Sequence, residues 1–166
     1  MPGNTVGLMK PGVAQLPENM QDEDLSQVEP RTYEISDSPL SSKLMTVLIL
    51  EDDAVFASTL KETLEIQDYR VTVVPSGREG IEQVLVTHFD AIVCDMVMPN
   101  FPGDMFYRAV ERTRPHLCKR FIFITGHQND PRIVQFVTES GCLVLWKPFE
   151  MRRLFDALET VTGRSS

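Results

Sequence analysis

The chain has 166 residues, a formal net charge of −8, 42% hydrophobic residues and 24% charged residues. At roughly 150 residues per domain, this length predicts one domain with a core of ordinary size. The apolar runs are far shorter than the ~18 residues of a membrane span, so we expect no membrane segment. The negative charge argues against direct binding to nucleic acid or anionic lipid. Three scattered cysteines without a CxxC pair favour a cytoplasmic location: Cys94, Cys118 and Cys142.

Residues 1–43 differ in composition from the rest of the chain. They contain five of the eleven prolines, a single aromatic residue and a net charge of −4. A segment with so little apolar surface cannot offset its ordering entropy, so we expect a disordered acidic N-terminal tail. It could instead be a short acidic interaction segment near Asp22, or translation could begin at Met45. We expect the folded domain over residues 44–162 and a short C-terminal tail over 163–166.

The first half of this domain shows two strands and two helices in alternation. A continuous apolar run over 46–50 predicts a strand covered on both faces. The helix expected over 54–67 has apolar residues at every fourth position: Phe56, Leu60 and Leu64. A second strand follows over 70–74. The next helix begins at Ser76, which forms a capping-box pattern with Glu79, and we expect it to bury three residues: Ile81, Val84 and Leu85.

The second half continues the alternation. We expect strands over 91–94, 121–124 and 143–146, and helices over 104–112 and 150–161. Between the last two strands, Asp130 and Pro131 mark a helix start and Gly141 marks its end. Five strands alternating with five helices predict one doubly wound α/β domain, a (βα)5 sandwich with a parallel sheet. We expect the flavodoxin-like strand order 2-1-3-4-5.

Polar residues follow four of the five predicted strands. Strand 1 ends in Glu51-Asp52-Asp53, strand 3 in Asp95, strand 4 in Thr125 and strand 5 in Lys147. In open α/β sheets, ligands bind outside the carboxyl ends of the strands, where the strand order reverses. The order 2-1-3-4-5 therefore brings the acidic groups of strands 1 and 3 into one crevice, flanked by the threonine and the lysine.

Clustered carboxylates need a cation. Two of them ~4 Å apart repel by about 4 kcal/mol at an effective dielectric constant near 20. Oxygen-only ligands suit a hard divalent ion, and Mg²⁺ tolerates several carboxylates while keeping bound waters. Such a site with a lysine and a hydroxyl suits a phosphoryl group, and one carboxylate could act as the nucleophile that forms an acyl phosphate.

These residues together resemble the receiver domain of two-component response regulators, in the CheY-like superfamily. The resemblance covers about residues 45–162 and lies in four segments in the same order: 47–53, 95–99, 124–126 and 147–149. It implies that Asp95 is the phosphoacceptor and takes a phosphoryl group from a phosphohistidine with the help of Mg²⁺. It also implies a metal site formed by Asp52, Asp95, the backbone carbonyl of Val97 and, mainly through bound water, Glu51.

The resemblance assigns three further residues to the phosphoryl group. Lys147 should pair with one oxygen, Thr125 should hydrogen-bond another after phosphorylation, and the amide of Gly126 should donate as well. The bond from Lys147 to Pro148 is often cis in this family. Simpler interpretations also exist: Asp53 as a helix cap, Asp95 as a turn residue, Thr125 as a local turn and Lys147 as a solvated lysine.

Two features depart from the family pattern or modify it. Where relatives commonly have an aromatic switch residue, three positions before the lysine, this chain has Val144. Val97 and His127 occupy positions that tune the lifetime of the acyl phosphate in relatives. Val97 cannot orient an attacking water by hydrogen bonding, whereas His127 has the groups to do so.

The resemblance implies a signalling protein rather than an enzyme, one that catalyses only its own aspartyl phosphorylation and dephosphorylation. Only five residues follow Val161, so we expect no output domain of its own. Its partners would be a sensor histidine kinase or histidine phosphotransfer protein, and a downstream target protein. The target would bind the fourth helix, the fifth strand and the last helix, and a weak homodimer could use the same face.

Two other functions stay open. The first is a Mg²⁺-dependent aspartate-nucleophile phosphatase, although such enzymes typically have a second aspartate where this chain has Val97. The second is a receiver-like interaction module that works without phosphorylation.

Overall fold

The computed structural model describes residues 44–163. The predicted N-terminal tail (1–43) and residues 164–166 of the predicted C-terminal tail lie outside the described residues. Within residues 44–163, no helix is both long and apolar enough to cross a membrane.

The described residues form a five-stranded sheet in which every neighbouring pair is parallel. The strand order is β2-β1-β3-β4-β5, which confirms the predicted flavodoxin-like topology. The strands are β1 (Met45–Leu50), β2 (Tyr69–Val74), β3 (Ala91–Asp95), β4 (Phe121–Thr125) and β5 (Leu143–Trp146). Leu50 pairs with both Val74 and Cys94, so the carboxyl ends of β1, β2 and β3 meet at one edge. The central strands β3 and β4 are buried along their whole length, as their continuous apolar sequences predict.

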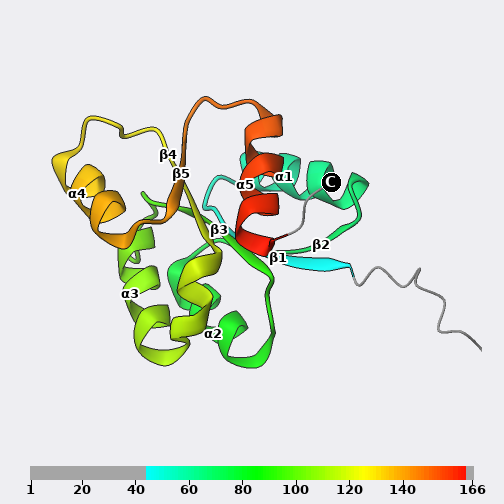
Figure 1. Cartoon of the computed structure of the whole chain (residues 1–166), viewed down its shortest axis with the longest axis horizontal. Coiled ribbons are helices and arrows are strands. Elements are labelled where there is room, and N and C mark those ends of the chain that lie inside the picture. The colour runs from blue at the N-terminus through cyan, green and yellow to red at the C-terminus, as the bar shows by residue number, and fades with distance from the viewer. Residues whose placement is uncertain (1–43, 164–166) are drawn as a thin grey trace, which may run out of the picture. The chain divides into compact units, whose positions relative to one another are not determined.

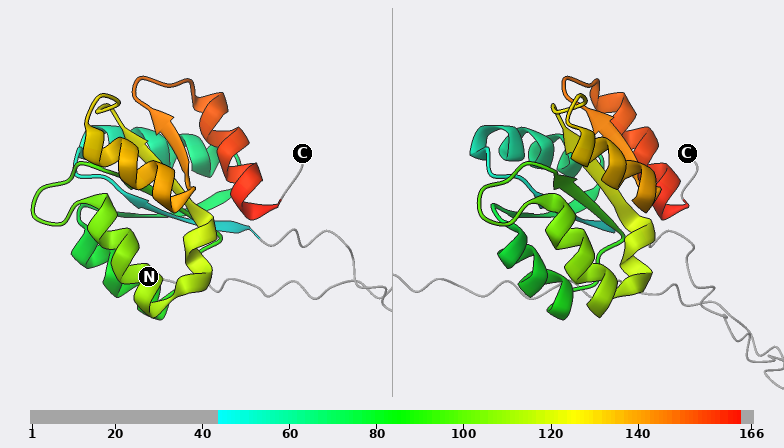
Figure 2. Two further views of the ribbon diagram at one scale, coloured as in Figure 1. Left: turned by 60° about the vertical axis from the view of Figure 1, so that its left-hand side comes forward. Right: turned by 90° about the vertical axis from the view of Figure 1, so that its left-hand side faces the viewer.

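Helices cover both faces of the sheet (Figures 1 and 2). One face is covered by α1 (Ala54–Ile66) and α5 (Met151–Thr162), and the other by α2 (Gly77–Val86), α3 (Gly103–Thr113) and α4 (Pro131–Ser140). Each face has its own apolar core. The core on the α2–α3–α4 face contains a group of five packed aromatic rings: Phe106, Tyr107, Phe121, Phe123 and Phe136.

The predicted helix ends are confirmed at three N-termini. The side chains of Asp53, Ser76 and Asp130 accept hydrogen bonds from backbone N–H groups in the first turns of α1, α2 and α4. Gly141 ends α4 in the left-handed conformation, with a φ of 64°, which glycine adopts without a Cβ penalty.

Two sequence predictions need correction. Leu85 was expected in the core together with Ile81 and Val84, but it is 47% exposed, whereas Val84 is buried and Ile81 is half-buried against the core. A 3₁₀ helix, η2 (Pro115–Arg120), connects α3 to β4 and was not predicted. Its single buried apolar residue, Leu117, gives no helical periodicity to detect.

Candidate functional site

The carboxyl ends of four strands bring the predicted polar residues to one edge of the sheet. Glu51 follows β1, Asp95 and Thr125 are the last residues of β3 and β4, and Lys147 follows β5. Backbone hydrogen bonds continue the sheet past these ends. The N–H of Met96 donates to the carbonyl of Ile124 at 3.0 Å, and the N–H of Lys147 donates to the carbonyl of Thr125 at 2.8 Å. The site is therefore built on rigid backbone rather than on free loops.

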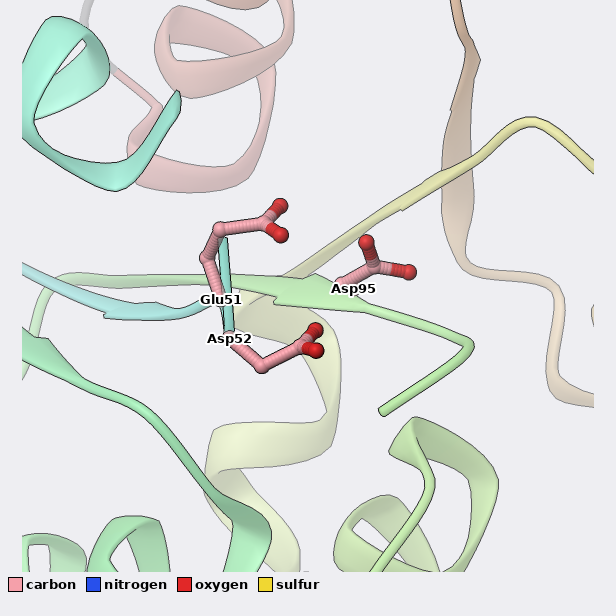
Figure 3. Close-up of side chains that lie close together, drawn as sticks. All are labelled: Glu51, Asp52 and Asp95. Atoms are coloured by element: carbon pink, nitrogen blue, oxygen red, sulfur yellow. The ribbon is translucent and has the colours of Figure 1, made fainter. Parts of the chain in front are cut away.

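Three carboxylates gather at this edge (Figure 3). The side chains of Glu51 and Asp52 extend from the end of β1 toward Asp95 at the end of β3 (Figure 3), and one oxygen of each lies within 4.8 Å of the others. Glu51 and Asp95 are buried, whereas Asp52 is exposed. Three hard oxygen donors this close together, open to solvent on one side, fit a divalent cation such as Mg²⁺.

Lys147 is the cation that the chain itself supplies to this cluster. Its Nζ donates to Oε2 of Glu51 at 2.9 Å and to Oδ2 of Asp95 at 2.7 Å. The peptide bond between Lys147 and Pro148 is cis. These contacts exclude the interpretation of Lys147 as a solvated surface lysine.

The pKa values of this group reflect both burial and mutual contact. Burial raises the pKa of Glu51, the hydrogen bond from Lys147 partly offsets this, and the charge of Asp95 raises it again. Burial alone would lower the pKa of Lys147, but its hydrogen bonds to Asp95 and Glu51 prevail and raise it. Its contacts therefore favour the charged form of Lys147, while burial disfavours the anionic form of Glu51.

The second oxygen of Asp95 is held by backbone. Oδ1 accepts the N–H of Val97 at 2.8 Å, so the carboxylate is fixed at both oxygens. Beneath it, the start of α3 lies against the backbone of β3, where a Cβ added to Gly103 would lie 2.5 Å from the carbonyl oxygen of Asp95. Only glycine permits this close approach. Sequence reasoning missed Gly103, for which the adjacent helix start was the sole signal.

The loop after β4 carries the remaining predicted residues. Thr125 is buried, and its Oγ1 accepts the N–H of His127 at 3.1 Å, which is the local turn contact that the simpler interpretation predicted. Gly126 lies beside Lys147, since a Cβ on this glycine would be 3.9 Å from that of the lysine. The side chain of His127 is exposed. Val144 is half-buried and packs against the core on the α2–α3–α4 face.

An aromatic contact to Lys147 was also missed. The ring of Phe56, in the first turn of α1, has its centroid 4.4 Å from Nζ of Lys147. The ring of Phe149 packs edge-on against Phe56, with centroids 6.3 Å apart. Helical spacing indicated that Phe56 is a core residue, and it does pack on the core, but spacing cannot reveal a contact to a lysine 91 residues away.

Comparison with known protein families identifies residues 47–159 as a response regulator receiver domain. Among curated relatives, the probable chemotaxis protein CheY of Rhizobium etli is 29% identical, with 70% of this chain and 92% of that protein aligned. The response regulator ArlR of Staphylococcus haemolyticus is 27% identical, with 73% of this chain and 54% of that protein aligned. Several relatives are much longer: the chain spans 24% of the hydrogenase transcriptional regulatory protein HoxA of Cupriavidus necator and 12% of the sensor kinase CckA of Brucella abortus.

Solved structures have the same fold. The non-phosphorylated HemR receiver domain of Leptospira biflexa is 27% identical, has a TM-score of 0.64, and matches 74% of this chain and 97% of its own. The chemotaxis response regulator CheY4 of Vibrio cholerae is 26% identical, has a TM-score of 0.63, and matches 71% of this chain and 98% of its own.

Proposed function

Because this chain belongs to the response regulator receiver domain family, we propose that it is phosphorylated on Asp95 by a phosphohistidine donor. Membership places the chain in two-component signalling, which implies a histidine kinase as a partner. The acidic pocket of Glu51, Asp52 and Asp95 is consistent with a phosphorylation site. A histidine phosphotransfer protein is the alternative donor.

One observation carries this proposal: Asp95 shares a cluster of carboxylates with Glu51 and Asp52, and its Oδ2 lies 2.7 Å from the ammonium of Lys147. The carboxylate is thus oriented by two donors and open to a cation site. A carboxylate held in this way can act as a nucleophile toward phosphorus. A turn or capping residue would need neither the lysine nor the neighbouring acids.

The acidic cluster is typical of the Mg²⁺ site of receivers, and its donor set fits that ion. We propose that Asp52, Asp95 and the carbonyl of Val97 bind Mg²⁺ directly and that Glu51 acts mainly through bound water. When bound, the ion would neutralise negative charge on the phosphoryl oxygens and on the attacking carboxylate.

The residues around Asp95 would then bind the phosphoryl oxygens during the transfer. The N–P bond of the donor breaks as a carboxylate oxygen of Asp95 forms the O–P bond. The ammonium of Lys147 would change its hydrogen-bond acceptor from Oδ2 of Asp95 to a phosphoryl oxygen. The hydroxyl of Thr125 accepts a hydrogen bond from His127 in this structure, so its own proton is available for a phosphoryl oxygen, and the amide of Gly126 donates to another.

Two residues at the rim would set the lifetime of the aspartyl phosphate. The side chain of Val97 is 46% exposed and has no group that can orient water. His127 is exposed and has ring nitrogens that can. We therefore propose that His127, rather than Val97, orients water for hydrolysis.

Phosphorylation would be transmitted by the loops after β4 and β5, which would exchange between two conformations. The new charge on Asp95 would favour one of them. We propose the surface of α4, β5 and α5 as the binding face for a target protein, and the same face for a weak homodimer. With Val144 in place of the usual aromatic residue, backbone shifts of these loops would transmit the change. The cytoplasmic location stays a prediction.

The direct test is incubation with acetyl phosphate and Mg²⁺, followed by mass mapping of an acid-stable, base-labile phosphate. We expect a single phosphate on Asp95 and none on the Asp95→Asn variant. A phosphate on another residue would refute the assignment. Steady turnover of a phosphomonoester would instead favour the phosphatase, and partner binding unchanged by Asp95→Ala would favour the phosphorylation-independent module.

A further inference from the structure

The ammonium of Lys147 has three neighbours. Its Nζ lies 2.9 Å from Glu51, 2.7 Å from Asp95 and 4.4 Å from the ring centroid of Phe56. Glu51 follows β1 and Asp95 is the last residue of β3. The ring belongs to α1, on the face of the sheet that α1 and α5 cover. A cation within about 6 Å of a ring centroid is attracted to the face of the ring.

The ring makes a different kind of contact from the two carboxylates. A hydrogen bond to a carboxylate fixes the direction of an N–H group, whereas attraction to a ring face depends mainly on distance. An ammonium over a ring can therefore turn from one anionic oxygen to another without losing the ring contact. This is the movement that Lys147 needs when a phosphoryl oxygen replaces Oδ2 of Asp95 as its partner.

Phe56 is itself held in place on both sides. Its ring packs against the apolar core of the α1–α5 face, and the ring of Phe149 contacts it edge-on at 6.3 Å. Phe149 lies only two residues after Lys147. Phe56 therefore contacts the loop after β5 twice, once at the ammonium and once at the aromatic residue that follows it.

We propose that Phe56 is a positioning residue that keeps the ammonium of Lys147 at the phosphorylation site while it exchanges Asp95 for the phosphoryl group. This inference rests on the proposed function of Asp95. Removal of the ring should leave the fold and the carboxylate cluster intact. It should slow phosphorylation only because the ammonium of Lys147 is less well positioned.

The test compares phosphorylation rates with acetyl phosphate and Mg²⁺ in the full chain. Phe56→Leu keeps an apolar side chain and removes the ring, and we expect about two- to fivefold slower phosphorylation. Phe56→Tyr keeps the ring and should restore the rate. Phe155→Leu is the matched control, because Phe155 is also half-buried against the same core and, within residues 44–163, the ammonium of Lys147 lies over the ring of Phe56 alone. The rate of Phe155→Leu should therefore equal that of the wild type.

A double-mutant cycle separates positioning from a general structural effect. In a Lys147→Met background, Phe56→Leu should cause no further slowing, because the lysine through which the ring acts is gone. Equal slowing with and without the lysine, or no rescue by Phe56→Tyr, would overturn the inference. A wild-type rate for Phe56→Leu would also overturn it and leave the role of Asp95 untouched, whereas a wild-type chain that takes no phosphate would refute the proposed function itself.

Discussion

Replacement of Lys147 by methionine should destabilise the fold, because it removes the positive charge from a largely buried acidic cluster. The two carboxylates that it contacts have side chains only 2% (Glu51) and 10% (Asp95) exposed. Methionine keeps most of the apolar stem, so the change isolates the loss of the ammonium. Without it, Glu51 and Asp95 face each other as unpaired anions.

The magnitude follows from the burial of the three groups. Loss of one partner from a buried ion pair costs about 3–5 kcal/mol, and because the side chain of Lys147 is 28% exposed, we expect a smaller loss of about 2–3 kcal/mol. For a urea m-value of about 2 kcal/mol/M, the unfolding midpoint would fall by about 1–1.5 M.

The loss should depend on pH in a defined direction. The pKa of Glu51 is raised in the folded state, chiefly by burial, and removal of Lys147 raises it further. A carboxyl group with a raised folded-state pKa favours the fold below its unfolded pKa, and this advantage is lost as pH rises through the folded-state value. The destabilisation by Lys147→Met should therefore be full at about pH 7.5 and smaller at about pH 5.

The assay is urea unfolding without divalent ions, followed by the fluorescence of Trp146, the one tryptophan of the chain. Lys61→Met is the matched control: Lys61 is 45% exposed and forms a helical pair with Glu65 at 3.8 Å, so its loss should change stability by less than about 0.5 kcal/mol. Equal midpoints for Lys147→Met and the wild type, or a loss that grows as pH falls, would refute the reasoning.

Three further changes should alter stability. Mg²⁺ at about ten times its Kd should raise the Tm by about 5 °C, and Asp52→Ala should remove most of this gain; an undiminished gain in calorimetry would place the metal elsewhere. Gly103→Ala should cost about 1–3 kcal/mol in urea unfolding, since its Cβ would lie 2.5 Å from the carbonyl of Asp95, whereas Gly126→Ala, with 3.9 Å to the nearest atom, should cost less. Asp53→Ala should cost about 1 kcal/mol in the same assay, and no loss would contradict its role as the cap of α1.

The sequence was sufficient for the strands and the strand-end residues, because these depend on local patterns, and for the topology, because the alternation of strands and helices restricts it. Apolar runs rich in β-branched residues, most of them continuous, predicted all five strands to within one residue at each end. The order 2-1-3-4-5 followed from the α/β alternation and the family resemblance. The helix caps at Asp53 and Asp130 were also predictable, since a capping side chain acts on N–H groups two or three residues away.

The contacts that could not be predicted join elements far apart in the chain. In the sequence, Phe56 is one of several apolar residues of an amphipathic helix. Only the packing of α1 beside the loop after β5 brings its ring to Lys147. Gly103 likewise reads as a residue near a helix start until α3 is seen against the backbone of Asp95. Leu85 was misjudged because a position at the margin of an apolar stripe can face either the core or the solvent.

The most direct test of the central claim is a crystal structure of the protein with Mg²⁺ and beryllofluoride, which imitates a phosphoryl group. We expect beryllofluoride bound to a carboxylate oxygen of Asp95, the ion beside Asp52, and the ammonium of Lys147 in contact with a fluorine atom. An empty edge, with the carboxylates of Glu51, Asp52 and Asp95 turned away from one another, would contradict the account.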